Sequence, residues 1–392
     1  MPTPIVSTLV PPKDVLSLDE LDPLKHKRSE FMLSDDRIYM DGNSLGPLSK
    51  TARDRVANVV SQQWGNDLIH SWNTHNWIDL PHSVGDKIAP LIGAERGQVI
   101  ACDSTSVNLF KVLASALALN PGRATVLSQR DNFPTDLYMV QGMSELLGRS
   151  RCTLKTVSED QLVDNVDDSV AVLLLTEVNF RTGYLHNMKK LTEIAHKAGV
   201  LVIWDLAHSA GALDVQLDEC NVDFAVGCGY KYLNGGPGAP AFIYTANRHH
   251  QSVSQPLSGW MGHSSPFDFE HDYKAGKAMS KYLTGTPNIL SLASLDAALD
   301  VFSDVDISDL RCKSVSLSEL FIKCVDRESS LTEFQLISPR DAALRGSQLA
   351  FSHDQAFAIS RALNDHNVVV DFRAPNIIRF GLTPLYLSLI HI

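Results

Sequence analysis

Two short apolar runs in the middle of the chain each lead to an ionisable side chain. Residues 199–204 (GVLVIW) are followed at once by Asp205, and residues 222–226 lead through a glycine-containing turn to Lys231. Continuous runs of large apolar and β-branched residues are typical of strands buried on both faces of a parallel sheet. Because ligands bind outside the carboxyl ends of such strands, we expect Asp205, His208 and Lys231 to lie together at one sheet edge.

An acid and a lysine at one edge are the pair that a pyridoxal phosphate (PLP) enzyme needs. The lysine binds the cofactor aldehyde covalently, and the carboxylate keeps the pyridine nitrogen protonated so that the ring can accept electrons. This lysine lies in GCGYKYLNGGPG, where glycines permit close approach of a ligand to the backbone. For either residue taken alone, a solvated polar strand end is the alternative interpretation. No GxGxxG motif follows a strand, which disfavours a dinucleotide-binding fold.

The composition is that of an ordinary globular chain. Of the 392 residues, 44% are hydrophobic and 20% are charged, which suits one large and one smaller domain. The net charge of -11 disfavours nucleic acid and anionic membranes as partners. The six cysteines lack metal-binding spacing, and residues 1–10 lack a signal-peptide pattern. We therefore expect reduced thiols, no metal site, no membrane span and a cytoplasmic location.

Two motifs resemble those of one enzyme family. WDLAHSAG (204–211) followed by VDFAVGCGYKYLNGGPG (222–238) is similar to the kynureninases, fold-type I PLP enzymes of tryptophan catabolism. Cysteine desulfurases share the Asp-x-x-His pattern and a later lysine, but they are not expected to combine YKYLN with the GW motif at 259–260. The resemblance covers residues 31–386 and implies an α/β fold, with a large domain built on a mainly parallel sheet flanked by helices and a smaller α+β domain.

The domain boundaries are predicted as follows. An N-terminal arm, with a short helix around residues 16–33, occupies residues 1–60 and contributes to the small domain and the site. The large PLP-binding domain follows over residues 61–300, and the small C-terminal domain over residues 301–392. After Tyr386 the family continues for several tens of residues, so we expect this small domain to be only partly covered.

The resemblance assigns most of the cofactor site. Hydroxyl residues after Asp103 can cap a helix or, with the free N–H groups of its first turn, bind a phosphate, and the resemblance favours the phosphate. The FPTD segment at 133–136 is similar to a family element whose aromatic ring lies against the cofactor, although such residues also suit a core and a helix start. The implied cofactor contacts are Thr105, Ser106, Phe133, Pro134, Thr135, Asp136, Thr176, Asp205, His208, Tyr230 and Lys231.

Two further motifs imply a homodimer with shared active sites. SGWMGH (258–263) resembles the family's G-W-x-G-H motif, whose tryptophan binds the cofactor phosphate from the neighbouring subunit. Trp260 is therefore expected to be a cross-subunit contact. Thr286, in LTGTPN (283–288), stands where some family members have asparagine, and it is also expected to reach across the dimer.

Substrate contacts are implied at Ser44, His70 and Arg379. GNSLG (42–46) formally matches the nucleophile elbow of serine hydrolases, but only one strand precedes it and a proline follows it, so we reject that interpretation. The loop is similar instead to the family loop that receives the substrate carboxylate. His70 opens an aromatic stretch that in the family lines the aryl pocket, and His70, Trp72 and Trp77 stay open as the contact to the substrate ring. Arg379 is expected to bind the α-carboxylate bidentately.

The implied reaction is hydrolysis of the Cβ–Cγ bond of kynurenine or 3-hydroxykynurenine. The products are anthranilate or 3-hydroxyanthranilate and L-alanine, in tryptophan catabolism and pyridine nucleotide biosynthesis. Lys231 is expected to move the α-proton, Asp205 to keep the pyridine nitrogen protonated, and Tyr230 to give a proton to Cβ. Two alternatives stay open: another PLP β-lyase such as a cysteine desulfurase, which needs a mobile nucleophilic cysteine, and a catalytically impaired relative that only binds ligands.

Overall fold

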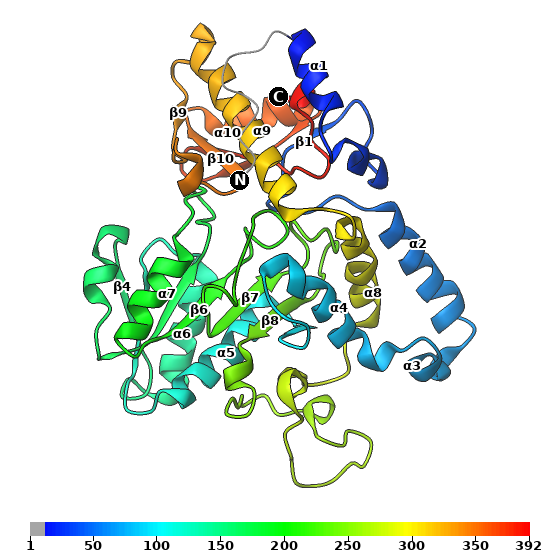
Figure 1. Ribbon diagram of the computed structural model, residues 1–392, viewed down its shortest axis with the longest axis vertical. Coiled ribbons are helices and arrows are strands. Elements are labelled where there is room, and N and C mark those ends of the chain that lie inside the picture. The colour runs from blue at the N-terminus through cyan, green and yellow to red at the C-terminus, as the bar shows by residue number, and fades with distance from the viewer. Residues whose placement is uncertain (1–11) are drawn as a thin grey trace.

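The computed structural model describes residues 12–392, in which a large sheet and a smaller one are joined by helices (Figure 1). The larger sheet has the strand order β2-β8-β7-β6-β5-β3-β4. Strands β3 to β7 run parallel to one another, and β8 is antiparallel to its two neighbours, β7 and β2. This confirms the predicted mainly parallel sheet. Its strands are β2 Val99–Cys102, β3 Thr125–Gln129, β4 Thr153–Val157, β5 Val170–Thr176, β6 Leu201–Asp205, β7 Phe224–Cys228 and β8 Ala241–Thr245.

Alternate residues of each strand pack into two separate cores, because successive side chains of a strand point to opposite faces. In β5, Val172 and Leu174 belong to the core that also contains residues of α5 and α6. Leu173 and Leu175 belong to the other core, with residues of α4, α7 and α8. The sheet is therefore covered on both faces. These helices are α4 Leu80–Ile88, α5 Thr105–Leu119, α6 Pro134–Leu147, α7 Met188–Lys197 and α8 Ile289–Ala298.

The smaller sheet lies beside both ends of the described chain (Figure 1). Its order is β12-β13-β10-β9, with every pair antiparallel, and β1 of the N-terminal segment pairs in parallel with β11. The N-terminal segment thus joins the C-terminal one, while the exact domain boundaries stay a prediction. The elements here are α1 Pro12–Glu20, β1 Ile38–Tyr39, α9 Ile307–Arg327, β9 Gln335–Leu336, β10 Gln348–Ser352, α10 Ala356–Asp365, β11 Val368–Val369, β12 Asp371–Arg373 and β13 Ile377–Gly381.

The prediction of a single helix around residues 16–33 is wrong. Helix α1 ends at Glu20, and a separate 3-10 helix covers Lys25–Glu30. Pro23 lies in the break. A proline disfavours helical backbone in the residue before it and has no N–H group to continue the helix, so one apolar pattern became two short elements.

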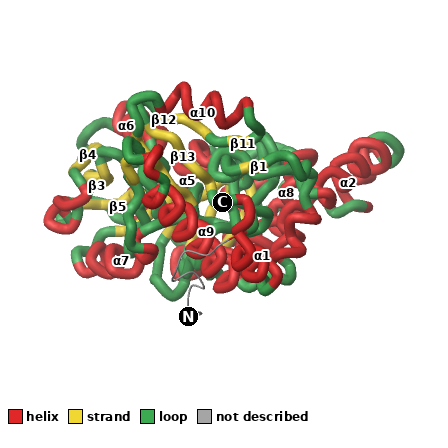
Figure 2. Tube along the Cα trace, turned by 90° about the horizontal axis from the view of Figure 1, so that it is seen from above, coloured by secondary structure: helices red, strands yellow, loops and turns green. Residues whose placement is uncertain are grey.

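Helix α2 (Lys50–Asn58) projects sideways from the body of the molecule (Figure 2). It continues into a π-helical segment, Val59–Trp64, and the short helix α3 (Ser71–Thr74) follows. Around this tip the apolar side chains of Trp64, Leu68 and Ile69 are 57%, 59% and 72% exposed. A surface of this kind suits contact with another protein.

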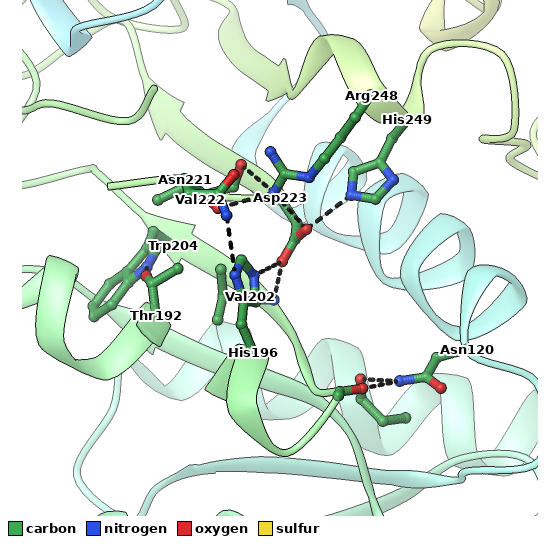
Figure 3. A network of polar contacts seen from close by, with 12 residues as sticks. Asn120, Thr192, His196, Val202, Trp204, Asn221, Val222, Asp223, Arg248 and His249 are labelled. Atoms are coloured by element: carbon green, nitrogen blue, oxygen red, sulfur yellow. Dashed lines mark hydrogen bonds and ion pairs between the residues drawn. The ribbon is translucent and has the colours of Figure 1, made fainter. Parts of the chain in front are cut away.

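A buried aspartate ties together the amino-terminal edge of the large sheet (Figure 3). Asp223, immediately before β7, accepts hydrogen bonds from the Nε2 atoms of His196 and His249 at 2.8 Å each, from Arg248 at 2.7 Å and from the backbone N–H of Val202 at 2.9 Å. Burial raises the pKa of Asp223, but the hydrogen bonds from the two histidines outweigh it and lower the pKa below its ordinary value. The carboxylate is therefore charged at neutral pH and links four chain segments.

Replacing this carboxylate by an amide, Asp223→Asn, is expected to lower the free energy of unfolding by about 3 kcal/mol, because Arg248 loses its counter-charge and a buried amide cannot accept all the hydrogen bonds that the carboxylate accepts. Urea unfolding followed by circular dichroism measures the difference. The exposed Asp168→Asn serves as the matched control. If both variants unfold at the same urea concentration, Asp223 does not stabilise the sheet.

Candidate active site

Three neighbouring strands carry candidate side chains to one edge of the large sheet. Strands β5, β6 and β7 are parallel neighbours. Thr176, the last residue of β5, lies opposite Asp205, the last residue of β6. Strand β7 ends three residues before Lys231, and His208 follows β6 by the same interval. The structure thus places Asp205, His208 and Lys231 along one cavity at the carboxyl end of the sheet.

The turn that carries Lys231 packs against the GNSLG loop of the N-terminal segment. The backbone N–H of Gly46 donates a hydrogen bond to the carbonyl of Tyr230 at 2.8 Å. A Cβ atom on Gly46 would lie 2.3 Å from the carbonyl oxygen of Lys231, so only glycine allows this approach. A loop far away in the sequence therefore fixes the backbone of Lys231.

The amino group of Lys231 is held by a histidine. Its Nζ donates a hydrogen bond to Nε2 of His208 at 3.0 Å. Burial lowers the pKa of His208 well below its usual value, and the positive charge of Lys231 lowers it further. The imidazole is therefore uncharged at neutral pH and accepts this hydrogen bond, which orients the amino group.

Two buried carboxyl groups line the same cavity. Asp205 and Asp136 are 2% and 1% exposed, and Asp205 accepts the backbone N–H of Ala207 at 2.8 Å. Burial raises the pKa of both groups, and the charge of Asp205 raises that of Asp136 further, whereas the charge of Lys231 lowers the pKa of Asp205. We assign the negative charge to Asp205, because both Lys231 and the N–H group stabilise its ionised form.

The start of α5 forms the opposite wall and offers hydrogen-bond donors. Ser104 is its N-cap and accepts the backbone N–H of Val107 at 3.4 Å. Thr105 and Ser106 occupy the first turn and line the cavity. Hydroxyl groups and free N–H groups at a helix start bind anions such as phosphate. Beneath them the buried Lys111 forms an ion pair with the Asp103 carboxylate at 2.5 Å, which anchors this turn.

The cavity has a volume of about 290 Å³. Phe133 gives it an aromatic face, with Nζ of Lys231 lying 6.0 Å from the ring centroid. An amine, a buried carboxylate, an aromatic ring and an anion site are the groups that PLP requires for its aldehyde, ring nitrogen, ring face and phosphate, so the residues present fit this cofactor. The lining residues are Ser104, Thr105, Ser106, Phe133, Thr135, Asp136, Thr176, Asp205, Ala207, His208, Tyr230 and Lys231.

The other residues expected at the site do not line this cavity. His70 and Thr286 are exposed, and Pro134 is the first residue of α6, directly after Phe133. Trp260 is 38% exposed. The residues outside the lining are Ser44, His70, Pro134, Trp260, Thr286 and Arg379.

Ser44 and Arg379 nevertheless lie together beside the cavity. Nη2 of Arg379 is 3.1 Å from Oγ of Ser44, although 335 positions separate them in the sequence. Nη1 of Arg379 donates to the carbonyl of Phe180 at 2.5 Å, and the Phe180 ring packs edge-on against Phe133, with centroids 5.2 Å apart. The two expected carboxylate-binding groups are therefore linked to the cavity through Phe180 and Phe133, and Phe133 lines the cavity.

Two aspartates that the sequence interpretation missed accompany Arg379. Asp371 forms an ion pair with it, and Asp41 lies close to both. Burial together with the charge of Asp371 raises the pKa of Asp41 to about 7. The sequence did contain a signal for Asp371, because charged residues alternate with apolar ones in the hairpin at 371–381, which indicates that Asp371 and Arg379 share one face. Nothing in the sequence indicated the position of Asp41.

Within residues 12–392, no group of three or more histidine, cysteine, aspartate or glutamate side chains could hold a metal ion. In the same range no helix combines the length and the apolar character needed to cross a membrane.

Comparison with known sequences identifies close relatives. Residues 310–392 match the kynureninase C-terminal domain. The kynureninase of Deinococcus radiodurans is 48% identical over 391 residues, covering 98% of this chain and 95% of that protein. The kynureninase of Pseudomonas fluorescens is 45% identical over 377 residues, covering 95% of this chain and 91% of that protein.

Solved structures with the same fold are more distant in sequence. A C-DES Lys-to-Ala variant, with glycine covalently linked to its PLP cofactor, has a TM-score of 0.80 at 14% identity, covering 93% of this chain and 96% of that one. The apo cysteine desulfurase of Thermococcus onnurineus NA1 has a TM-score of 0.77 at 18% identity, covering 98% and 96%. At these identities the likeness concerns the fold alone.

The sheet order, the two-part architecture and the donor set around Lys231 define a PLP-dependent enzyme of fold type I. The sequence comparison narrows this class, since relatives of 43–48% identity span nearly the whole chain. The chain belongs to the kynureninase family. Membership in this family makes it a PLP-dependent hydrolase of a carbon–carbon bond.

The pKa of Asp41 predicts how pH affects the binding of carboxylate ligands near Arg379. Below pH 7 Asp41 is neutral, and the charges of Arg379, Arg373 and Asp371 sum to one positive charge. Above pH 7 Asp41 ionises, the sum falls to zero, and an anionic ligand is attracted less strongly. The affinity for L-alanine, titrated through the absorbance of bound cofactor, is therefore expected to fall between about pH 6 and pH 8.

The matched control is Asp41→Asn, which keeps the side-chain shape and removes the ionisation. Over the same range its affinity is expected to depend less on pH than that of the wild type. Identical pH profiles for the two proteins would mean that Asp41 does not control this site.

Proposed function

We propose that the chain hydrolyses the Cβ–Cγ bond of L-kynurenine or 3-hydroxykynurenine, releasing anthranilate or 3-hydroxyanthranilate together with L-alanine. The observation that carries this proposal is the cavity in which Lys231, His208 and the buried Asp205 converge in a chain of this family. The pathway that it serves is tryptophan catabolism leading towards pyridine nucleotides.

Residues that line the cavity would hold the cofactor. Asp205 would hold the protonated ring nitrogen, Phe133 would lie against the ring, and Thr105 and Ser106 at the start of α5 would hold the phosphate. When bound, PLP supplies an electron sink that stabilises negative charge at the substrate α-carbon. The burial of Asp205 strengthens its hold on the ring proton, because water does not compete there.

Lys231 moves the proton at the substrate α-carbon. In the resting protein its amino group donates to the uncharged His208 ring, which keeps it oriented without adding a second positive charge. Tyr230 lines the same cavity, and burial raises the pKa of its phenol. The phenol therefore keeps its proton at neutral pH and can donate it to Cβ.

The substrate α-carboxylate is received by Arg379 and Ser44. A guanidinium binds a carboxylate bidentately, in a geometry that lysine reproduces poorly. The buried position of Arg379, at 1% exposure, strengthens this attraction. His70 is assigned to the aryl end of the substrate, where its exposed side chain faces outward from its own subunit.

The exposed position of His70, Trp260 and Thr286 supports a homodimer that shares its active sites. Trp260 packs against Phe267 and Phe269, with ring centroids 5.7 and 6.3 Å away, and these phenylalanines are 61% and 73% exposed. Exposed aromatic clusters of this size favour protein contacts. A second subunit would cover this segment and place Trp260 at the cofactor phosphate of its neighbour. We place the dimer in the cytoplasm.

A cysteine desulfurase activity is less well supported. Cys228 is 4% exposed, its thiol lies 3.7 Å from the carbonyl of Ala207, and burial raises its pKa, so it is a poor nucleophile. Cys312 and Cys324 lie within α9. A mobile nucleophilic cysteine at the cavity is what that reaction needs, and none of these three thiols provides it.

Replacing the central amine, Lys231→Ala, is expected to lower alanine release from L-kynurenine by at least about 1,000-fold, because covalent attachment of the cofactor and proton transfer are lost together. Its visible cofactor band is expected to change even without substrate. The exposed Lys190→Ala on α7 is the matched control and should behave as wild type. Activity in Lys231→Ala close to that of the control would refute the assignment.

A further inference from the structure

The register of the β12–β13 hairpin places Asp371 directly opposite Arg379. Nε of Arg379 donates to Oδ1 of Asp371 at 2.8 Å, and Nη2 donates to Oδ2. Opposite charges at facing positions of an antiparallel pair attract each other. Because both partners are largely buried, this two-point contact fixes the plane of the guanidinium rather than only its position.

The same carboxylate also holds the second group that receives the substrate. Oγ of Ser44 donates to Oδ2 of Asp371 at 2.7 Å. The serine comes from the N-terminal loop, 327 positions away from Asp371. One side chain of the small sheet therefore orients a hydroxyl group from one end of the chain and a guanidinium from the other.

Among the described residues, the hydrogen bonds of Arg379 use four of the five N–H groups of its guanidinium. Asp371 occupies the edge formed by Nε and Nη2, and the carbonyl of Phe180 takes one N–H of Nη1. On the remaining edge, between Nη1 and Nη2, the second N–H of Nη2 donates to Oγ of Ser44 at 3.1 Å. The fifth N–H, on Nη1, and the N–H that Nη2 gives to Ser44 are the two donors of this edge, so a carboxylate that binds it bidentately takes the place of Oγ of Ser44 as the acceptor of Nη2.

The charges around Asp371 keep this edge attractive to an anion. Arg373 forms a second ion pair with Oδ2 of Asp371 at 2.9 Å, so one carboxylate is shared by two guanidinium groups. Asp41 is the other acid of the cluster. With Asp41 protonated, the cluster has one uncompensated positive charge, which a substrate carboxylate can neutralise.

We propose that Asp371 is the positioning residue of the carboxylate subsite, which holds the guanidinium of Arg379 and the hydroxyl of Ser44 in the orientation that selects α-amino acids with a free α-carboxylate. The inference rests on the proposed function and adds a determinant of specificity to it. Asp371 acts through these two groups and does not itself touch the substrate.

The test compares two ligands in Asp371→Asn. One is L-kynurenine, and the other is kynuramine, the same molecule without its α-carboxylate. Affinities are titrated through the absorbance of bound cofactor, and KM and kcat are measured for L-kynurenine. Wild type should prefer the carboxylate ligand. In Asp371→Asn this preference should fall about 10- to 100-fold, the loss expected for a charged hydrogen-bonding partner, with a raised KM and a kcat within a few fold of wild type.

Three variants make the result interpretable. Asp371→Glu restores the charge on a longer side chain and should recover part of the preference. Asp365→Asn, at an exposed position of α10, should match wild type. In an Arg379→Ala background, Asp371→Asn should have little further effect on the preference, because its partner is already absent. If Asp371→Asn does not fold, as judged by thermal unfolding, the comparison of Asp371→Glu with wild type decides, and an unchanged preference contradicts the proposal.

Two results would overturn the inference in folded Asp371→Asn: an unchanged preference, or an equal loss of affinity for both ligands, which indicates a general structural role. Failure of the proposed function is recognised separately. In that case the wild type releases no alanine from L-kynurenine, whereas the ligand preference and its dependence on Asp371 can still be measured by binding.

Discussion

The burial of the Asp205 carboxylate beside Lys231 is the interaction on which the site depends. A buried carboxylate is costly unless a positive charge and hydrogen bonds compensate it, and here the charge of Lys231 and the N–H of Ala207 do so. Both residues reach the same place because parallel strands end at one edge. The strand register places Thr176 opposite Asp205 and so fixes where both residues lie at this edge.

The two edges of the large sheet have different roles: the amino edge stabilises the fold, and the carboxyl edge carries the candidate active site. At the amino edge, four donors from three chain segments surround Asp223. At the carboxyl edge, Asp205 has one backbone donor and faces a cavity. A carboxylate whose oxygens all have hydrogen-bond donors is rigid and inert, whereas one with unused acceptor positions can bind a cationic group of a ligand.

The N-terminal loop connects the carboxyl edge to the small sheet. Gly46 of this loop contacts the turn that carries Lys231, and Ser44 contacts Asp371.

Sequence reasoning was sufficient where the signal is local. Strand patterns predicted the apolar runs that lead to Asp205 and Lys231, and a helix-start pattern indicated the hydroxyl residues of α5. All of these residues line one cavity. It failed around residues 16–33, where a proline outweighed an apolar pattern. The contact of Asp371 with Ser44 and the position of Asp41 depend on tertiary packing between distant segments, which no spacing in the sequence encodes.

The most direct test of the account is a single titration of the purified protein with PLP and then with L-kynurenine, while absorbance and alanine release are recorded together. The account predicts a visible cofactor band that shifts when the substrate is added and alanine formed in a one-to-one ratio with anthranilate. A stable cofactor band without alanine formation would contradict the proposed reaction, and the lack of any cofactor band would contradict the assignment of the cavity itself.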